Sequence, residues 1–579
     1  MANQQHNTVV AERANQLLVE GLLGAGRQKE AIDLCIRICS APGAKPRDWL
    51  MFGCLSADTG NIATAMTALK KAVELDPELV EAHFALGKLL AAAGNPQSAV
   101  DWLEKAAQLQ PDNAEVWLTL GVTCGLAKQP EKSEQYCRRS LELQPASAAA
   151  RFNIGNALQG QGKLAEAASE YESAVALDPR MGEAWSMLAQ VLFGLRRLEE
   201  AKQAAQRALT LNPGIGEAHF TLGNVLHALG DRDQAIESLR EAARLLPGDA
   251  RVHLRLGELL FRKGEYAGAS DSLFTVTTLA PDSTEAHFRL GQCFLKRKMA
   301  GRAENCYRRV VALDRNHMRA HYQLAMMLGQ MGRREESAKH FAEVLRIKPD
   351  DEQARHLLAA QHGETPQTAH SAYIRTLFDG FAATFDTKLV EELQYRVPQE
   401  LSDFVGQHVQ PAANSLDIID LGCGTGLCGP LFRGMARKLH GVDLSSGMIE
   451  KARVRNIYDS LEVNDIATSL KVGDNAWDLA ISTDVFIYVG DLREIFASVR
   501  DALRPGGRFA FSVEADDDAD SFVLRSTGRY AHAARYIRSL AAEHGFEEMA
   551  QQTTGLRKEK GEFVAGHLFL FRRGNDAGR

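Results

Sequence analysis

The chain has 579 residues, more than a single hydrophobic core usually serves, so at least two folding units are expected. Its hydrophobic content of 45% and charged content of 24% are ordinary for a globular protein. The formal net charge of -7 gives no support for electrostatic binding to nucleic acid or to a membrane surface.

The first ten residues, MANQQHNTVV, have neither a basic segment nor an apolar one, so no signal peptide is expected. No apolar stretch approaches the roughly 20 residues that span a bilayer. The nine cysteines lack paired spacing, which favours reduced, buried thiols over disulfides or a zinc site. We therefore expect a cytoplasmic protein that holds no metal.

An internal repeat of 34 residues fills the first half of the chain. Proline recurs at this period as Pro77, Pro111, Pro145, Pro179, Pro213, Pro247 and Pro281, and again at Pro349. Small residues recur at the same period as Gly53, Gly87, Gly121, Gly155, Ala189, Gly223, Gly257, Gly291 and Ala325. Small side chains allow two helices to pack closely, and proline ends the second helix of each pair. The pattern predicts stacked helix pairs.

These markers resemble the tetratricopeptide repeat family over about residues 9–349. The resemblance implies an all-α superhelix of about ten repeats across residues 1–349, with a capping helix and linker at 350–370. Such arrays present a concave groove, so a protein or peptide partner is expected there. The alternative is that the array only scaffolds the chain or forms a homo-oligomer.

One repeat position holds a planar side chain in most copies. The residues are His83, Trp117, Trp185, His219, His253, His287 and His321. A histidine ladder could suggest metal binding or pH sensing. Successive copies lie on different repeats, too far apart to share one ion, so we interpret the position as packing between repeats.

The pattern changes near residue 411 to short apolar strands that alternate with helices. Strands are expected at 416–421, 439–442, 460–463, 477–482, 508–513 and 564–571, with a turn at 504–507 and a helix at 531–544. This alternation predicts a doubly wound, mostly parallel sheet over residues 371–579. Ligands of such sheets bind at the carboxyl ends of the strands.

The first strand leads into the sequence Gly422-Cys423-Gly424-Thr425-Gly426. A tight turn from strand to helix needs residues without a Cβ atom, so that the backbone can approach a ligand. Asp443 follows about twenty residues later, at the end of the second strand, where a carboxylate can accept ribose hydroxyls. These features fit any adenosine cofactor, and residues 424–429 also satisfy the GxGxxG pattern of dinucleotide enzymes.

Three features favour a cofactor with an amino-acid moiety. Asp420, just before the glycine turn, suits an ammonium group and would repel a pyrophosphate. Asp465 ends the third strand, where it can accept from an adenine amino group. The Arg-Pro-Gly-Gly turn at 504–507 and the late helix and strand suit a seven-stranded sheet.

The segments DIIDLGCGTG, LHGVDLSSGMIEKA, VNDI, WDLAISTDVFIYV and LRPGGRFAFSVE resemble class I S-adenosylmethionine-dependent methyltransferases, which have a Rossmann-like seven-stranded α/β fold. SAYIRTLFDGFAATFDTKL and GRYAHAARYIRSLAAEHGF are similar to predicted bacterial methyltransferases that carry tetratricopeptide repeats. The resemblance implies that S-adenosylmethionine is held by Asp420, Gly422, Cys423, Gly424, Gly426, Asp443, Leu444, Met448, Asp465, Ile466 and Thr483.

Methyl transfer needs a base only when the acceptor keeps its proton until late. The candidates at the mouth of the site are Asp484, Tyr488 and His532, of which His532 has the most suitable ordinary pKa. The alternative for His532 is a helix-capping or surface histidine. The acid-rich stretch 514–520 could attract a cationic substrate, but it is better interpreted as a solvated loop.

A helical lead-in precedes the first strand and carries Phe378, Phe381, Phe385 and Asp386. These rings either close the cofactor site as a lid or form one packed helix face. The sequence thus predicts methyl transfer to an unidentified acceptor, with the repeat array recruiting a protein. The alternatives are a small-molecule methyltransferase with a scaffolding array, and a non-catalytic protein that senses the cofactor.

Overall fold

The computed structural model describes residues 15–382, 385–387, 394–471, 476–559 and 561–574. Its contacts divide the chain into two compact units, Met1–Pro281 and Asp282–Arg579. The division falls inside the repeat array, so the last repeats belong to the same unit as the α/β part. Among the described residues, no helix is both long and apolar enough to cross a bilayer.

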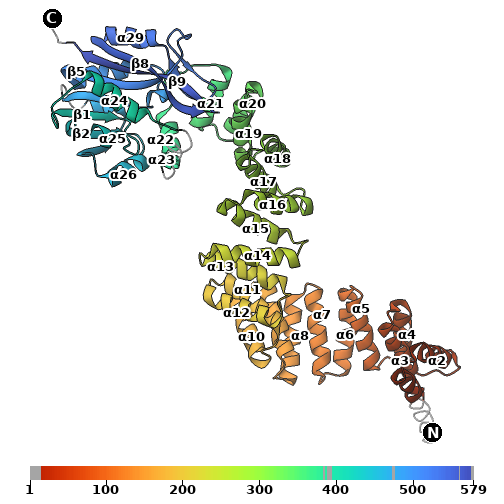
Figure 1. Ribbon diagram of the computed structural model, residues 1–579. Coiled ribbons are helices and arrows are strands. Elements are labelled where there is room, and N and C mark those ends of the chain that lie inside the picture. Colours follow the sequence, from red (N-terminus) through yellow and green to blue (C-terminus); the bar gives the residue numbers. More distant parts are fainter. Residues whose placement is uncertain (1–14, 383–384, 388–393, 472–475, 560, 575–579) are drawn as a thin grey trace. The chain divides into compact units, whose positions relative to one another are not determined.

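Antiparallel helix pairs form the repeats, as the 34-residue period predicts (Figure 1). In the first unit the helices are α2 (Gln28–Ser40), α3 (Pro46–Asp58), α4 (Ile62–Leu75), α5 (Val80–Ala92), α6 (Pro96–Leu109), α7 (Ala114–Leu126), α8 (Pro130–Leu143), α9 (Ala148–Gly160), α10 (Leu164–Leu177), α11 (Gly182–Gly194), α12 (Leu198–Leu211), α13 (Gly216–Ala228), α14 (Arg232–Leu245), α15 (Ala250–Lys263) and α16 (Tyr266–Leu279). In the second unit they are α17 (Thr284–Lys296), α18 (Ala300–Leu313), α19 (Met318–Gln330) and α20 (Arg334–Ile347).

The periodic glycines lie where the two helices of a repeat touch. A Cβ atom built on Gly291 of α17 would come within 2.7 Å of the Tyr307 ring on α18. That ring is fully buried, so it has no room to move away. The small-residue series therefore marks the closest approach of the paired helices.

Replacing Gly291 with alanine is expected to destabilise the second unit by roughly 1–3 kcal/mol, because the added methyl overpacks the helix contact. Gly301, on α18 of the same repeat, is the matched control, since a Cβ atom there meets nothing within 4 Å. Alanine at Gly301 should leave stability unchanged or raise it by up to about 1 kcal/mol. Calorimetric unfolding of both variants checks the pair, and equal effects would contradict the packing argument.

The planar side chains of the repeats make the same kind of hydrogen bond. In six of them the ring N–H donates to the backbone carbonyl six residues earlier, at the end of the preceding repeat. The pairs are His83 with Pro77 (2.9 Å), Trp117 with Pro111 (3.0 Å), Trp185 with Pro179 (3.2 Å), His219 with Pro213 (3.1 Å), His253 with Pro247 (3.2 Å) and His321 with Arg315 (3.2 Å). These bonds join each side chain to the preceding repeat, as the packing interpretation predicts.

Helix α21 (Glu352–His362) follows the last repeat and packs against the α/β part of the second unit. The Nε2 atom of His356 donates to the Gly528 carbonyl at 2.9 Å, and Gln361 donates to the Ser526 carbonyl at 2.9 Å. The linker continues this contact, since its Gln367 carbonyl accepts from the amides of residues 490 and 491. The predicted capping helix and linker are therefore part of the α/β packing.

The α/β part holds a mixed sheet whose strands run in the order β3-β2-β1-β4-β5, with β9 antiparallel to β5 and β8 beyond it. The strands are β1 (Leu416–Leu421), β2 (Ala436–Asp443), β3 (Ser460–Val463), β4 (Trp477–Ser482), β5 (Leu503–Ala515), β6 (Phe522–Leu524), β7 (Tyr530–His532), β8 (Phe546–Glu559) and β9 (Glu562–Arg573). Seven of them form the predicted doubly wound sheet. The short hairpin β6–β7 joins the end of β5 and makes nine.

The turn expected at 504–507 falls within the bounds of β5 as an irregularity, since Trp477 pairs with Leu503 and Leu479 with Arg508. Two other local expectations were wrong. The helix expected at 531–544 begins later, as α29 (Ala534–Glu543), because residues 530–532 pair as β7. The long strand β8 was not expected, since its polar sequence alternates poorly.

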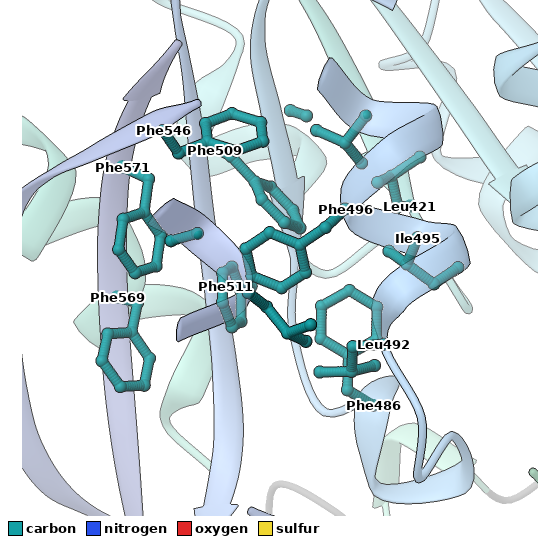
Figure 2. Packing of buried hydrophobic residues seen from close by; sticks show 14 of the residues in the cluster. Leu421, Phe486, Leu492, Ile495, Phe496, Phe509, Phe511, Phe546, Phe569 and Phe571 are labelled. Carbon is teal, nitrogen blue, oxygen red and sulfur yellow. The ribbon is translucent and has the colours of Figure 1, made fainter. Parts of the chain in front are cut away.

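Two apolar layers enclose the sheet. One lies between the sheet and the helices α27 (Ile466–Leu470), α28 (Arg493–Ala502) and α29. Figure 2 shows its centre, where Phe496 of α28 meets Phe509, Phe511 and Phe571 from the sheet. The other layer lies under α24 (Val397–His408) and α25 (Gly429–Phe432). The core on both faces holds the carboxyl ends of the parallel strands in place.

Candidate active site

A cavity of about 300 Å³ lies at the carboxyl ends of β1, β2, β3 and β4. One end is walled by residues 422–425 after β1, by the end of β2 and by residues 464–466 after β3. The other end is walled by residues 483–489 after β4, by Tyr395, and by Arg529 and Arg557. The parallel order of the strands brings these segments together, as expected for a doubly wound sheet.

The glycine turn needs glycine at three positions. Gly422, Gly424 and Gly426 have φ values of +75°, +55° and +84°, in the left-handed region that glycine tolerates best. A Cβ atom on Gly422 would lie 2.3 Å from a methyl group of Val485. On Gly424 the nearest atom would be 3.9 Å away, on the Phe385 ring, so the backbone faces the open cavity there.

Asp443 closes the same turn from the next strand. Its carboxylate accepts from the Gly424 amide at 2.9 Å and from the Ser445 amide at 2.8 Å. Burial raises its pKa, while those two amides lower it. The side chain lines the cavity beside Leu444. One group therefore ties the glycine turn to the end of β2 and offers its remaining lone pairs to a ligand.

Asp420 is buried beneath the turn, with 1% of its surface exposed. The Tyr458 hydroxyl donates to its Oδ2 atom at 2.7 Å, and among the described residues its Oδ1 atom has no partner. Burial, with a smaller contribution from the neighbouring Asp443, raises its pKa to about 7, although the bond from Tyr458 lowers it. An unpartnered carboxylate oxygen below the glycine turn fits a ligand with an ammonium group, although Asp420 does not itself line the cavity.

The free energy of unfolding should fall as pH rises from about 4 to about 7, because folded Asp420 retains a proton that the unfolded chain has lost. This group alone contributes a slope of roughly 1.4 kcal/mol per pH unit, and none above pH 7. Asp420→Asn should remove that slope, so the variant gains stability relative to the parent between pH 5 and 7. Chemical unfolding at several pH values checks this, and parallel pH profiles would contradict it.

The remaining predicted cofactor residues lie around the cavity. Cys423, Met448, Ile466 and Thr483 all line it. Asp465 also lines it, but its Oδ1 atom caps helix α27 by accepting from the amides of residues 467 and 468. Asp465 therefore has a local structural role, and only its second carboxylate oxygen is available to read an adenine edge.

The lead-in helices α22 (Ser371–Phe381) and α23 (Phe385–Thr387) form part of the cavity wall. Phe378, Phe381 and Phe385 line the cavity, and Phe378 packs edge-on against both Phe385 and Tyr488. The lid interpretation is favoured over a helix face packed elsewhere.

Two carboxylates fasten this lead-in to the site. Asp379 accepts from the Ser445 hydroxyl at 2.5 Å, next to the end of β2. Asp386 accepts from the Thr425 hydroxyl at 2.5 Å and pairs with Arg455 at 2.6 Å. The sequence indicated a helical lead-in, but not these contacts.

Of the three predicted catalytic residues, Asp484 and Tyr488 line the cavity and His532 does not. His532 is fully buried, and its Nε2–H donates to the carbonyls of Val489 (3.0 Å) and Gly490 (2.9 Å). Burial lowers its pKa to about 4. The expectation that His532 lies at the mouth was wrong, because β7 carries it into the packing between β5 and the 489–490 segment.

Asp484 and Tyr488 are held in different ways. Asp484 has a left-handed backbone, with φ of +58°, and its Oδ2 atom accepts from Arg557 at 2.9 Å. Burial raises the pKa of Tyr488, and the nearby Arg529 opposes this. Tyr488 therefore keeps its proton at neutral pH, and the Asp484 carboxylate is held by Arg557.

A buried charge cluster at this end of the cavity was not predicted. Arg557 of β8 pairs with Asp484, with Glu514 and, at 3.0 Å, with Glu559. Its side chain is 2% exposed, as is that of Glu514. The interpretation of 514–520 as a solvated loop was therefore wrong for Glu514. Asp484 follows β4 and Glu514 lies on β5, both far from Arg557 along the chain, so no local sequence pattern connects these two with it. Glu559 is two residues from Arg557 on β8.

Comparison with known proteins agrees with this architecture. Residues 419–511 match the family model described as a methyltransferase domain. Models of the tetratricopeptide repeat match residues 57–121, 114–147, 152–214, 226–290, 284–317 and 319–351. The two halves thus carry the two kinds of domain that their sequence motifs resemble.

Curated relatives match the C-terminal part. The malonyl-[acyl-carrier protein] O-methyltransferase of Hahella chejuensis is 32% identical over 187 residues, covering 31% of this chain and 63% of that protein. The biotin biosynthesis bifunctional protein BioHC of Saccharophagus degradans is 25% identical over 177 residues, covering 30% and 28%. The chain thus spans less than two thirds of the length of either relative. A solved S-adenosylmethionine-dependent methyltransferase from Methanosarcina mazei is 17% identical, with 30% and 98% covered and a TM-score of 0.26.

Proposed function

We propose that this chain, which carries tetratricopeptide repeats and a methyltransferase domain, transfers the methyl group of S-adenosylmethionine to an acceptor molecule. The observation that carries the proposal is one cavity in which a left-handed glycine turn and Asp443 meet at adjacent strand ends. The names of the curated relatives, which include O-methyltransferases, support it.

Each part of the cavity has a role in this proposal. The open backbone at Gly424 receives the amino-acid and ribose parts, and Asp443 accepts the ribose hydroxyls. Asp420, beneath the turn, offers its unpartnered oxygen to the ammonium group, whose positive charge favours the ionised form of this carboxyl. Leu444, Met448 and Ile466 offer apolar contacts to the adenine. When bound, the cofactor supplies a methyl group activated by a sulfonium, so the protein chiefly orients the donor and the acceptor.

The repeat array, in the same proposal, recruits a protein that bears the acceptor or that delivers it. Tetratricopeptide arrays offer extended concave surfaces that suit this role. The name of the Hahella relative pairs methyl transfer with a carrier protein, which supports a protein-borne acceptor. A small-molecule acceptor, with the array used only for assembly, is the alternative.

Removal of residues 1–281 tests recruitment, because it leaves the second compact unit whole. Full-length and shortened chains are incubated with radioactive S-adenosylmethionine and a protein extract of the source cells. We expect labelled protein bands with the full chain, at least tenfold weaker with residues 282–579. Calorimetry should show the same cofactor affinity for both. Equal labelling by both chains would contradict recruitment by the first unit.

A further inference from the structure

The β6–β7 hairpin brings one cation to the acceptor end of the cavity. We use this term for the end walled by Thr483, Asp484, Tyr488, Tyr395, Arg529 and Arg557. Its turn is fixed from outside by helix α21, through the bonds of His356 to Gly528 and of Gln361 to Ser526. Thr365 of the linker adds a third contact, because its hydroxyl oxygen accepts from the Leu524 amide at 3.3 Å. The next residue along the turn, Arg529, lines the cavity. The end of the repeat array therefore sets where this guanidinium lies.

Arg529 and Arg557 both line the cavity, but they differ in how many of their N–H donors are used in ion pairs within the protein. Arg557 has three carboxylate partners and is 2% exposed, so its donors are used inside the protein. Arg529 pairs with Glu559, beside the Tyr488 hydroxyl, and is 27% exposed. A guanidinium has five N–H donors, so in the described part of the chain Arg529 keeps donors for a ligand.

The nearby acidic groups are ion-paired with arginine. Asp484 and Glu514 both pair with Arg557, and Glu514 also pairs with Arg525 at 3.4 Å. Asp484 lines the cavity, and its second oxygen is buried without a hydrogen-bond partner among the described residues. Glu559 is shared by Arg529 and Arg557. The carboxylates at this end are therefore paired with arginine, and the remaining N–H donors of Arg529 are the charged groups offered to a ligand.

We propose that the methyl acceptor is a carboxylate, held at the acceptor end of the cavity by Arg529 beside Tyr488. This inference rests on the proposed function and adds the acceptor class to it. An arginine side chain matches the two oxygens of a carboxylate with parallel N–H bonds. The apolar rings of Phe378 and Tyr395, which also line the cavity, suit the carbon chain behind the carboxylate.

The chemistry of this acceptor suits the groups that are present. A carboxylate oxygen forms the new bond to the methyl carbon while the carbon–sulfur bond breaks, and that electron pair stays on sulfur. The products are a methyl ester and a neutral thioether, and no proton has to be removed. A base is therefore not required, in agreement with the placement of His532 outside the cavity and with the ion-paired state of Asp484.

Three probes of equal length test the acceptor class: butyrate, butylamine and butanol. Each is titrated into the full-length protein saturated with S-adenosylhomocysteine, and binding is measured by ligand-observed magnetic resonance. We expect butyrate to bind most tightly. Arg529→Gln should weaken butyrate by about 10- to 150-fold, as expected for a lost charge-assisted bond, and Arg529→Lys should fall between. The matched control is Arg538→Gln, an exposed arginine paired with Glu548 on the surface.

The affinity for S-adenosylhomocysteine separates the possible failures. No binding of it by the wild-type chain would defeat the proposed function itself. Normal binding, with butylamine preferred or with butyrate unaffected by Arg529→Gln, would overturn only the carboxylate inference. A second measurement needs no variant: mild alkali should release labelled methanol from the methylated products of the wild-type chain. Stable label would mean that the methyl group is on nitrogen, sulfur or an ether oxygen.

Discussion

Replacing Arg557 with methionine is expected to lower the free energy of unfolding of the second unit by about 3–5 kcal/mol. Removal of this buried cation leaves Asp484, Glu514 and Glu559 with one fewer partner, and Glu514 is only 2% exposed. Unpaired buried carboxylates are costly because water no longer solvates them. Methionine fills a similar volume, so the decrease in the free energy of unfolding reflects the unpaired carboxylates more than an empty cavity.

Calorimetric unfolding of the full-length protein measures this effect on the transition of the second unit. Arg538→Met is the control, because Arg538 and Glu548 form an exposed pair worth at most about 1 kcal/mol. A loss below about 1 kcal/mol for Arg557→Met would mean that the carboxylates take up protons or are solvated by water instead.

Asp443→Ala is expected to weaken S-adenosylmethionine binding by about 10- to 150-fold, the loss of one charge-assisted interaction of 1.5–3 kcal/mol. The effect should lie toward the upper end, because Asp443 also holds the Gly424 and Ser445 amides in place. The substitution removes a ligand contact and a support of the turn together. Isothermal calorimetry of the purified variant gives the affinity directly.

Asp459→Ala is the matched control for this measurement. Asp459 likewise accepts a backbone amide, that of Leu439 at 2.7 Å, and it pairs with Arg433 at 2.7 Å, but it does not line the cavity. Its loss should leave the affinity within about twofold of wild type. An equal fall in both variants would indicate general destabilisation, and an unchanged affinity in Asp443→Ala would refute the ribose assignment.

The features that repeat or that use special backbone geometry were predictable from the sequence. The 34-residue period follows from one physical demand made many times, that small residues lie where helices touch, as Gly291 does against Tyr307. The glycine turn was predictable for a related reason, since the left-handed φ values of Gly422, Gly424 and Gly426 exclude most other residues.

The acceptor end of the cavity could not be predicted from the sequence, because its residues are far apart along the chain and only the fold brings them together. Arg557, Asp484 and Glu514 come from three separate segments, and each has an ordinary local sequence. His532 was misplaced for the opposite reason. Its neighbours favour a helix, whereas pairing of β7 with residues 514 and 515 of β5 decides the structure there. Long-range pairing overrides local preference in such short strands.

The carboxylates of the lead-in show an intermediate case. The spacing of Phe378, Phe381 and Phe385 indicated one apolar helical face, but it gave no sign of what that face covers. The bonds of Asp379 to Ser445 and of Asp386 to Thr425 place it over the site. Both partners lie more than 35 residues away along the chain, so only the fold brings them together.

Isothermal calorimetry of the full-length protein with S-adenosylmethionine, S-adenosylhomocysteine and NAD tests the central claim most directly. Residues 424–429 satisfy the GxGxxG pattern, so a dinucleotide is the main alternative to S-adenosylmethionine as the ligand. The unpartnered oxygen of Asp420 below the turn suits an ammonium group and opposes a pyrophosphate. We expect the first two compounds to bind and NAD to give no heat of binding. Binding of NAD alone would contradict the proposed methyl transfer.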